Sequence, residues 1–270
     1  MDFNQNIILR KCRAFVIVLL PFAVFGLTYS LMNFLPNYQV NPIDTEGTYL
    51  LEKHLFPVFD KSANQILIPS EYCQTHHVAW LDIMSGLFYL LWVPLPISFA
   101  IYLYVRGFER SALRFSAAFL FVNLVGFIGY YVHPAAPPWY VMKYGFIPNV
   151  NTPGNVAGFE YFDALTHTRI FHSLYAKNAN VFAAIPSLHA AYNPIALYYA
   201  VRFHDKKWGI ALAIVSIGIC FSAVYSSHHY IIDVTLGLLT TILGIIIYEG
   251  VLLRLPFMIA LKRHLKGVLS

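Results

Sequence analysis

Long apolar segments alternate with shorter polar ones along most of this chain. A helix needs about 20 predominantly apolar residues to cross the hydrocarbon core of a bilayer. Six segments meet that requirement, namely residues 14–35, 78–105, 112–132, 182–203, 208–225 and 230–248. The pattern predicts an all-α, polytopic membrane protein with six transmembrane helices, built as a single integral membrane domain over residues 1–270.

Three further segments are too polar or too broken to span a bilayer. Residues 36–77 and 134–181 are interrupted by proline, and the second of them is rich in aromatic residues. We expect both to form re-entrant or interfacial segments on the outer face, with residues 134–181 folding as a lid or binding loop. Residues 251–270 mix leucine with lysine and arginine, which predicts an amphipathic tail on the inner surface.

The composition agrees with a membrane location. Apolar residues make up 58% of the chain and charged residues 11%, whereas about 25% of the residues of a soluble domain are charged. These proportions exclude a disordered chain, a basic nucleic-acid-binding domain and an ordinary cytosolic enzyme. The three cysteines are too few and too scattered for a disulfide framework.

Lysine and arginine are divided unequally between the two sides of the predicted bundle. With the N-terminus inside, 13 of the 18 basic residues fall in inner segments and the other 5 in outer segments. Cytoplasmic loops are enriched in basic residues. The sequence therefore predicts cytoplasmic N- and C-termini, and it places the long segments on the periplasmic, lumenal or extracellular face.

Two histidines and an aspartate lie near the outer ends of predicted spans. His189 is close to the start of the fourth span, and His229 precedes Asp233 by four residues at the start of the sixth. Residues four apart share a helix face, and a carboxylate in an apolar span is costly unless it is paired. Asp233 can therefore fix the tautomer of His229 and leave the other ring nitrogen free as a base or nucleophile. A purely structural His–Asp contact explains the same spacing, so both interpretations stay open.

The positions of both histidines also suggest a ligand. Backbone N–H groups at a helix N-terminus lack intrahelical partners, and such termini bind anions, phosphate above all. We expect the N–H groups near Ser187 and His229 to help hold a phosphate. Together these features predict phosphoryl transfer through histidine close to the outer surface.

Three motifs in this region resemble those of a known family. The sequences Pro186-Ser187-Leu188-His189 and His229-Tyr230-Ile231-Ile232-Asp233 resemble the two histidine motifs of the type-2 phosphatidic acid phosphatase superfamily. The stretch Pro134-Ala135-Ala136-Pro137-Pro138-Trp139-Tyr140 is similar to a segment of its inositol phosphorylceramide synthase branch. The resemblance covers residues 130–237, within a histidine phosphotransferase core at about 112–250.

The resemblance implies an enzyme, its reaction and several residue roles. It implies a membrane phosphotransferase that moves a phospho-headgroup, such as phosphoinositol, from a phospholipid donor to a lipid acceptor through a phosphohistidine. His229 would be the nucleophile, Asp233 would orient it, and His189 would act as general acid and base. Ser187 would contact the phosphate. We expect no cofactor, no metal and no nucleic-acid partner.

The chain departs from the phosphatase members of the superfamily in the basic residues that bind phosphate. It has no Lys-x6-Arg-Pro segment, and Ser222-Ala223 stands where those enzymes have Ser-Arg. The candidate replacements in the outer loop are Lys143, Arg169 and Lys177, and His228 is a further candidate for phosphate binding. Trp139 and Tyr140 either line a lipid headgroup site or anchor the interface.

Three alternatives remain open at this stage. A lipid phosphatase of the same superfamily would use water as the acceptor. A small-molecule transporter would belong to another functional class, although the predicted spans show no central path of charged residues. A metal site is the third alternative, and its possible ligands are His76, His77, His228, His229 and Asp233.

Overall fold

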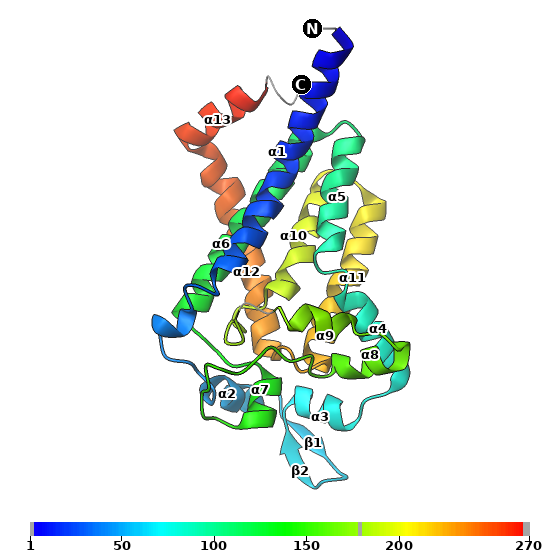
Figure 1. Ribbon diagram of the computed structural model, residues 1–270, viewed down its shortest axis with the longest axis vertical. Helices are drawn as coiled ribbons and strands as arrows, with labels where there is room; N and C mark the ends of the chain where they lie inside the picture. Colours follow the sequence, from blue (N-terminus) through cyan, green and yellow to red (C-terminus); the bar gives the residue numbers. More distant parts are fainter. Residues whose placement is uncertain (1–2, 178–179, 267–270) are drawn as a thin grey trace.

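The computed structural model describes residues 3–177 and 180–266. Its long helices run side by side along one axis, and shorter elements gather at one end (Figure 1). The predicted outer segments lie at that end, and the segments predicted to be inner meet at the opposite end, where the N-terminus also lies. The segments predicted to be outer and those predicted to be inner therefore lie at opposite ends of the bundle.

Four helices are long and apolar enough to cross a membrane. They are α1 (Phe3–Leu31), α6 (Glu109–Val132), α11 (Lys206–Tyr225) and α12 (Ile231–Gly250). The predicted second span is broken into α4 (Ala79–Tyr89) and α5 (Pro94–Val105), which bend by 44° at the proline-containing break. Counted as one span, this pair brings the number among the described residues to five.

The predicted fourth span differs most from the expectation. Helix α10 covers only Leu188–Arg202, 15 residues, and the apolar residues before it are not helical. Ala135 donates its N–H to the carbonyl of Phe182, and Ala183 forms a bridge with Ala135, so this part of the chain pairs with another segment. The six-helix expectation is therefore reduced to four or five full-length spans with a shorter α10 among them.

The outer end contains short helices and one β-hairpin. The helices are η1 (Asn37–Gln39), α2 (Gly47–Leu55), α3 (Pro69–Thr75), α7 (Pro138–Tyr144), α8 (Phe159–Thr166) and α9 (Ile170–Tyr175). Strands β1 (Val58–Asp60) and β2 (Gln65–Leu67) pair antiparallel, which corrects the all-α expectation. The Asp60 carboxylate accepts hydrogen bonds from Ser62, and Asn64 adopts a positive φ of 51°, so the turn residues make the hairpin possible.

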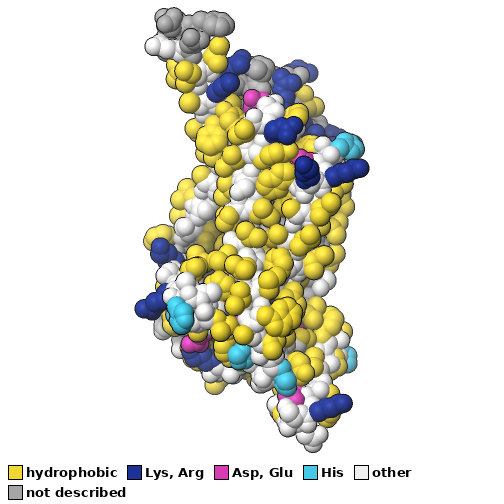
Figure 2. Space-filling model, turned by 90° about the vertical axis from the view of Figure 1, so that its right-hand side faces the viewer, with side chains coloured by type: hydrophobic (Ala, Val, Ile, Leu, Met, Phe, Trp, Pro, Cys, Tyr) yellow, Lys and Arg dark blue, Asp and Glu magenta, His cyan; other side chains and the backbone are white. Residues whose placement is uncertain are grey.

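Helix α10 occupies the centre of the bundle, between α6, α11 and α12. Glycines allow this close packing: a Cβ at Gly126 would lie 2.3 Å from Leu188, and one at Gly244 would lie 2.8 Å from Val122. The outward faces carry exposed apolar side chains. Figure 2 shows a broad apolar band without lysine or arginine between two ends that carry them, as expected of a protein surrounded by lipid.

The end that the sequence predicts to be inner is closed by an ion-pair network and the C-terminal segment. Arg114 and Arg202 pair with Glu249, which also accepts a hydrogen bond from Tyr199 at 2.5 Å. The predicted tail contains η2 (Leu252–Arg254) and α13 (Pro256–Lys266), and its residues 267–270 lie outside the described part of the chain.

Candidate active site

The two motif histidines and the aspartate meet at the outer end of the bundle. His189 Nδ1 lies 3.1 Å from His229 Nε2, and His229 Nδ1 lies 3.3 Å from the nearer carboxylate oxygen of Asp233. His229 is 5% exposed and Asp233 is fully buried. The three side chains thus form a continuous polar chain at the boundary of an apolar core.

Two local features place these side chains together. The Ser187 hydroxyl accepts a hydrogen bond from Ala190 and begins α10, which points His189 toward α12. The Ser187 N–H donates to the Asp233 carbonyl at 2.9 Å, and a Cβ at Gly237 would lie 2.1 Å from the Ser187 carbonyl. The absence of a side chain at Gly237 therefore lets the two helices approach closely enough for the histidines to touch.

The hydrogen-bond pattern indicates the tautomer of His229. With Asp233 as the acceptor of this contact, the proton of His229 is on Nδ1. The lone pair of His229 is then on Nε2, which faces His189. Burial lowers the pKa of His229 to about 3, so its ring is neutral near pH 7 and Nε2 is available as a nucleophile.

The N-terminus of α12 is already occupied by carboxylates. Glu52 of α2, fully buried, accepts hydrogen bonds from the N–H groups of Ile231 at 2.9 Å and Ile232 at 3.2 Å. Asp233 accepts from the N–H of Tyr230 at 3.0 Å, and the His229 N–H donates to Ala223. The expectation that these N–H groups hold a phosphate is therefore wrong for α12. Burial raises the pKa of Glu52, and the two N–H groups oppose that rise.

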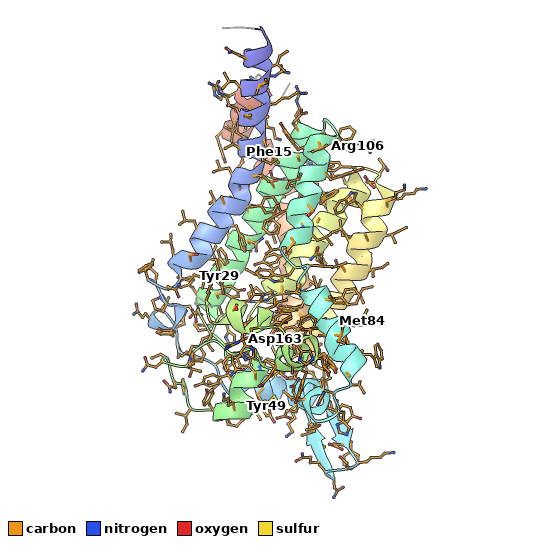
Figure 3. The ribbon with its side chains drawn as sticks, turned by 45° about the vertical axis from the view of Figure 1, so that its right-hand side comes forward. Phe15, Tyr29, Tyr49, Met84, Arg106 and Asp163 are labelled. Carbon is orange, nitrogen blue, oxygen red and sulfur yellow. The ribbon has the colours of Figure 1, made fainter. Side chains whose placement is uncertain are left out.

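A cavity of about 380 Å³ opens beside the histidines. Helices from both halves of the chain line it, and its wall includes His189, His228 and His229. Gly26 and Ser30 of α1 also line it, and both are exposed on the surface of the bundle. The cavity therefore reaches from the histidines to the apolar flank of α1, whose lower half Figure 3 marks with Tyr29.

The cavity divides the residues predicted to bind substrate into two groups. Its wall includes Lys177, His228 and Trp139. The described residues that line the cavity do not include the other predicted binding residues, which are Lys143, Arg169, Tyr140 and Ser187. The structure thus brings one of the three outer-loop cations to the cavity that holds the histidines.

The remaining predicted residues have other surroundings. The fully buried Tyr140 donates its hydroxyl to the Ile147 carbonyl and accepts from the Asn149 N–H, so it holds the outer loop together. Lys143 is exposed and lies over the Tyr144 ring. Arg169 is exposed and lines a separate shallow hollow that Lys177 also borders.

Helix α9 covers the cavity and is fastened by a buried carboxylate. Asp163 of α8 accepts hydrogen bonds from the His172 ring at 2.8 Å and from the N–H groups of Phe171 and His172. Burial opposes ionisation, but these hydrogen bonds hold the pKa of Asp163 below its ordinary value. The predicted lid is therefore a short helix with a charged anchor. Neither this anchor nor Glu52 has a signature in the sequence, because both also bind backbone N–H groups, which any residue type supplies.

A family model of the PAP2 (type-2 phosphatidic acid phosphatase) superfamily matches residues 66–247, which include both histidine motifs. The chain belongs to the PAP2 superfamily. This result confirms the family that the motifs predicted. Within the described residues, no group of three or more His, Cys, Asp or Glu side chains is placed to hold a metal ion.

Relatives of known function place this PAP2 protein in one branch. It is 51% identical to the phosphoinositol dihydroceramide synthase of Bacteroides thetaiotaomicron, over 90% of this chain and 79% of that protein. It is 27% identical to the inositol phosphorylceramide synthase catalytic subunit of Saccharomyces cerevisiae, over 85% of this chain but 55% of that one. No solved structure matches the chain. The names of these relatives confirm the prediction of a membrane phosphotransferase of the inositol phosphorylceramide synthase type.

Proposed function

We propose that this PAP2 protein transfers phosphoinositol from phosphatidylinositol to the primary hydroxyl of a ceramide-type lipid, through a phosphohistidine on His229. The observation that carries the proposal is the chain His189–His229–Asp233, with contacts of 3.1 and 3.3 Å, at the wall of a cavity that reaches the lipid-facing surface. The 51% identity to a phosphoinositol dihydroceramide synthase supports the choice of headgroup and acceptor.

The first half of the reaction forms the intermediate. The donor phosphate enters between the two imidazoles and replaces their direct contact. His229 Nε2 attacks phosphorus, and the bond from phosphorus to the diacylglycerol oxygen breaks. The anionic phosphate beside His189 favours its protonated form. His189 gives this proton to that oxygen, so diacylglycerol leaves as a neutral alcohol. Asp233 stabilises the positive charge that develops on the His229 ring.

The second half restores the enzyme. The acceptor hydroxyl loses its proton to the now neutral His189, and its oxygen attacks phosphorus while the bond to His229 breaks. His189 ends protonated and His229 neutral, as at the start of the cycle. Lys177 and His228 face the transferring group from the cavity wall and supply positive potential or hydrogen bonds where negative charge builds.

The proposal includes an orientation in the membrane. Both termini are cytoplasmic, and the cavity opens at the level of the outer leaflet, because the basic residues concentrate at the end of the bundle opposite the histidines. The chain crosses six times if the bent pair α4–α5 and the short α10 each count as one crossing. Fifteen residues of α10 extend about 22 Å, and the non-helical residues before it complete the passage.

The experiment combines product analysis with trapping of the intermediate. Purified protein is incubated with phosphatidylinositol labelled in its phosphate, with and without ceramide. We expect labelled phosphoinositol ceramide, and in His189→Ala an acid-labile, base-stable label on the protein. His229→Ala should carry no label, whereas His264→Ala, at the opposite end, should behave as wild type. Release of inositol phosphate without any ceramide product would mean that water, and not a ceramide-type lipid, is the acceptor, and a fully active His229→Ala would overturn the mechanism.

A further inference from the structure

Five tyrosines, each from a different helix, line the cavity together with the histidines. They are Tyr29 of α1, Tyr89 of α4, Tyr130 of α6, Tyr175 of α9 and Tyr192 of α10. They come from positions spread over most of the chain, so no local sequence pattern explains their convergence. A hydroxyl inside an apolar bundle is costly without a partner, and phenylalanine would pack equally well there.

The hydroxyl groups of these tyrosines lie close to one another. Tyr175 donates to the Tyr89 hydroxyl at 3.4 Å. Tyr29, Tyr130 and Tyr192 line the same cavity as this pair. The cavity therefore presents a cluster of neutral donors and acceptors that can rotate to suit a ligand.

The same tyrosines touch the proposed catalytic histidines. The Tyr89 ring stacks on His189 with centroids 4.9 Å apart, and the Tyr175 ring stacks on His228 at 4.2 Å. His228 is 4% exposed, and its Nε2 has no hydrogen-bond partner among the described residues. A group bonded to the transferred phosphate would thus lie directly against the hydroxyl cluster.

The charge of the cavity wall indicates which headgroup fits. Its described lining residues include one cation, Lys177, and no carboxylate. An aromatic cavity also suits a quaternary ammonium group. Lys177 would repel such a cation, however, and a quaternary ammonium group offers the tyrosine hydroxyls no hydrogen-bond partner. A ring that carries several hydroxyl groups uses both the hydroxyl cluster and the aromatic faces. The volume of about 380 Å³ lies in the range typical of small-ligand sites.

We propose that this tyrosine cluster, Tyr29, Tyr89, Tyr130, Tyr175 and Tyr192, is the binding site for the uncharged, polyhydroxylated headgroup of the donor lipid. The inference rests on the proposed function and adds the residues that select the headgroup.

The test removes single hydroxyls and keeps the rings. Tyr175→Phe and Tyr192→Phe are compared with Tyr72→Phe, a control on α3 whose ring stacks on His76 away from the cavity. Each cavity variant should raise KM for phosphatidylinositol on the order of tenfold, as loss of one or two neutral hydrogen bonds does. The acceptor KM and kcat should stay within about twofold. An unchanged donor KM in both variants, or a raised acceptor KM instead, would overturn the proposal.

A binding measurement separates this proposal from the proposed function. His229→Ala protein in nanodiscs is titrated with phosphatidylinositol and with phosphatidylcholine, whether or not wild type shows transfer. We expect the protein to bind phosphatidylinositol more tightly than phosphatidylcholine, and to lose this difference in affinity when Tyr192→Phe is added. Preference for phosphatidylcholine would mean that the aromatic rings form a cation site and would overturn it. Absence of transfer by wild type, with this preference intact, would overturn only the proposed function.

Discussion

Lys177 is the one lysine or arginine among the described residues that line the cavity. The two other cations of the outer segment at 134–181, Lys143 and Arg169, are exposed and do not contribute to its wall. The backbone N–H groups at the start of α12 bind carboxylates instead of an incoming phosphate. At the scale of single residues, Lys177 is therefore the cation that we propose to stabilise the transferring phosphate.

Lys177→Met should lower kcat on the order of a hundredfold, because loss of one transition-state donor commonly costs that much. Lys143→Met is the matched control and should keep kcat within about twofold, since Lys143 contacts the Tyr144 ring outside the cavity. Turnover is measured at saturating donor lipid in detergent micelles. Wild-type turnover in Lys177→Met would show that the charge of this lysine has no part in the reaction.

Glu52→Gln should impair both stability and turnover. A glutamine can place only one acceptor against the two N–H groups of Ile231 and Ile232, so one buried donor loses its partner, at a cost of about 1–3 kcal/mol. The start of α12 then shifts, and with it His229. Thermal unfolding and kcat are compared with those of Glu46→Gln, an exposed residue just before α2 that makes no capping hydrogen bond. Equal melting temperatures and equal kcat for the two variants would contradict the role of Glu52 in positioning His229.

The sequence predicted His189, His229 and Asp233 because motif spacing on a helix fixes which side chains share a face. It could not predict Glu52, because that contact joins a side chain to backbone groups 179 residues away. Such a contact depends on the position of α2 over α12 and leaves no pattern of residue types.

At the scale of elements, the crossing of α10 and α12 sets the distance between the two histidines. The crossing depends on Gly237, where the Ser187 carbonyl occupies the place of a side chain. Any shift of α12 away from α10 would also lengthen the hydrogen bond from the Ser187 N–H to the Asp233 carbonyl. The geometry of the site is thus set by packing between two helices as well as by the site residues themselves.

Gly237→Ala should reduce kcat on the order of a hundredfold, because displacement of a reacting group by about 1 Å can have that effect. A Cβ at this position would lie 2.1 Å from the Ser187 carbonyl, and backbone must move to admit it. Gly250→Ala, on the same helix with nothing within 4 Å of the added Cβ, should behave as wild type. The check is a comparison of turnover and melting temperature for the two variants. Similar values would mean that the helices can separate without cost.

Apolar segment length predicted α1, α6, α11 and α12 well, because each is a continuous helix in a continuous apolar run. Segment length failed at 182–187, which is not helical and whose residues Phe182 and Ala183 pair with Ala135. An apolar run does not by itself distinguish a helix from a buried extended segment. The hairpin β1–β2 was missed for a related reason, since its strands have three residues each and carry no alternating pattern long enough to recognise.

At the scale of the whole molecule, an apolar band separates two charged ends (Figure 2). The network of Arg114, Arg202 and Glu249 lies where α6 begins and where α10 and α12 end, and the two motif histidines lie where α10 and α12 begin, at the other end. A bundle with such unequal ends has a preferred direction of insertion. The orientation proposed above can therefore be tested without measuring any activity.

Cysteine at Lys61, in the hairpin turn, should react with a membrane-impermeant maleimide in intact cells. Cysteine at Lys207, at the start of α11, should react only after the membrane is permeabilised. Both positions are exposed lysines, and the three native cysteines are first replaced by serine because Cys12 is itself exposed. The opposite labelling pattern would reverse the orientation and place the histidines on the cytoplasmic side.

The cavity opens beside Gly26 and Ser30, on a flank of α1 that lipid surrounds. Under the proposed function, both lipid substrates then reach the histidines by diffusion within the plane of the bilayer, and not as dissolved monomers from water. The quantity that governs their encounter with the protein is the mole fraction of each lipid in the membrane. Adding inert lipid to a fixed amount of donor and acceptor then slows the reaction, although the bulk concentration of every reactant is unchanged. A cell can control the rate in the same way, by changing the lipid composition around the protein without changing the amount of protein.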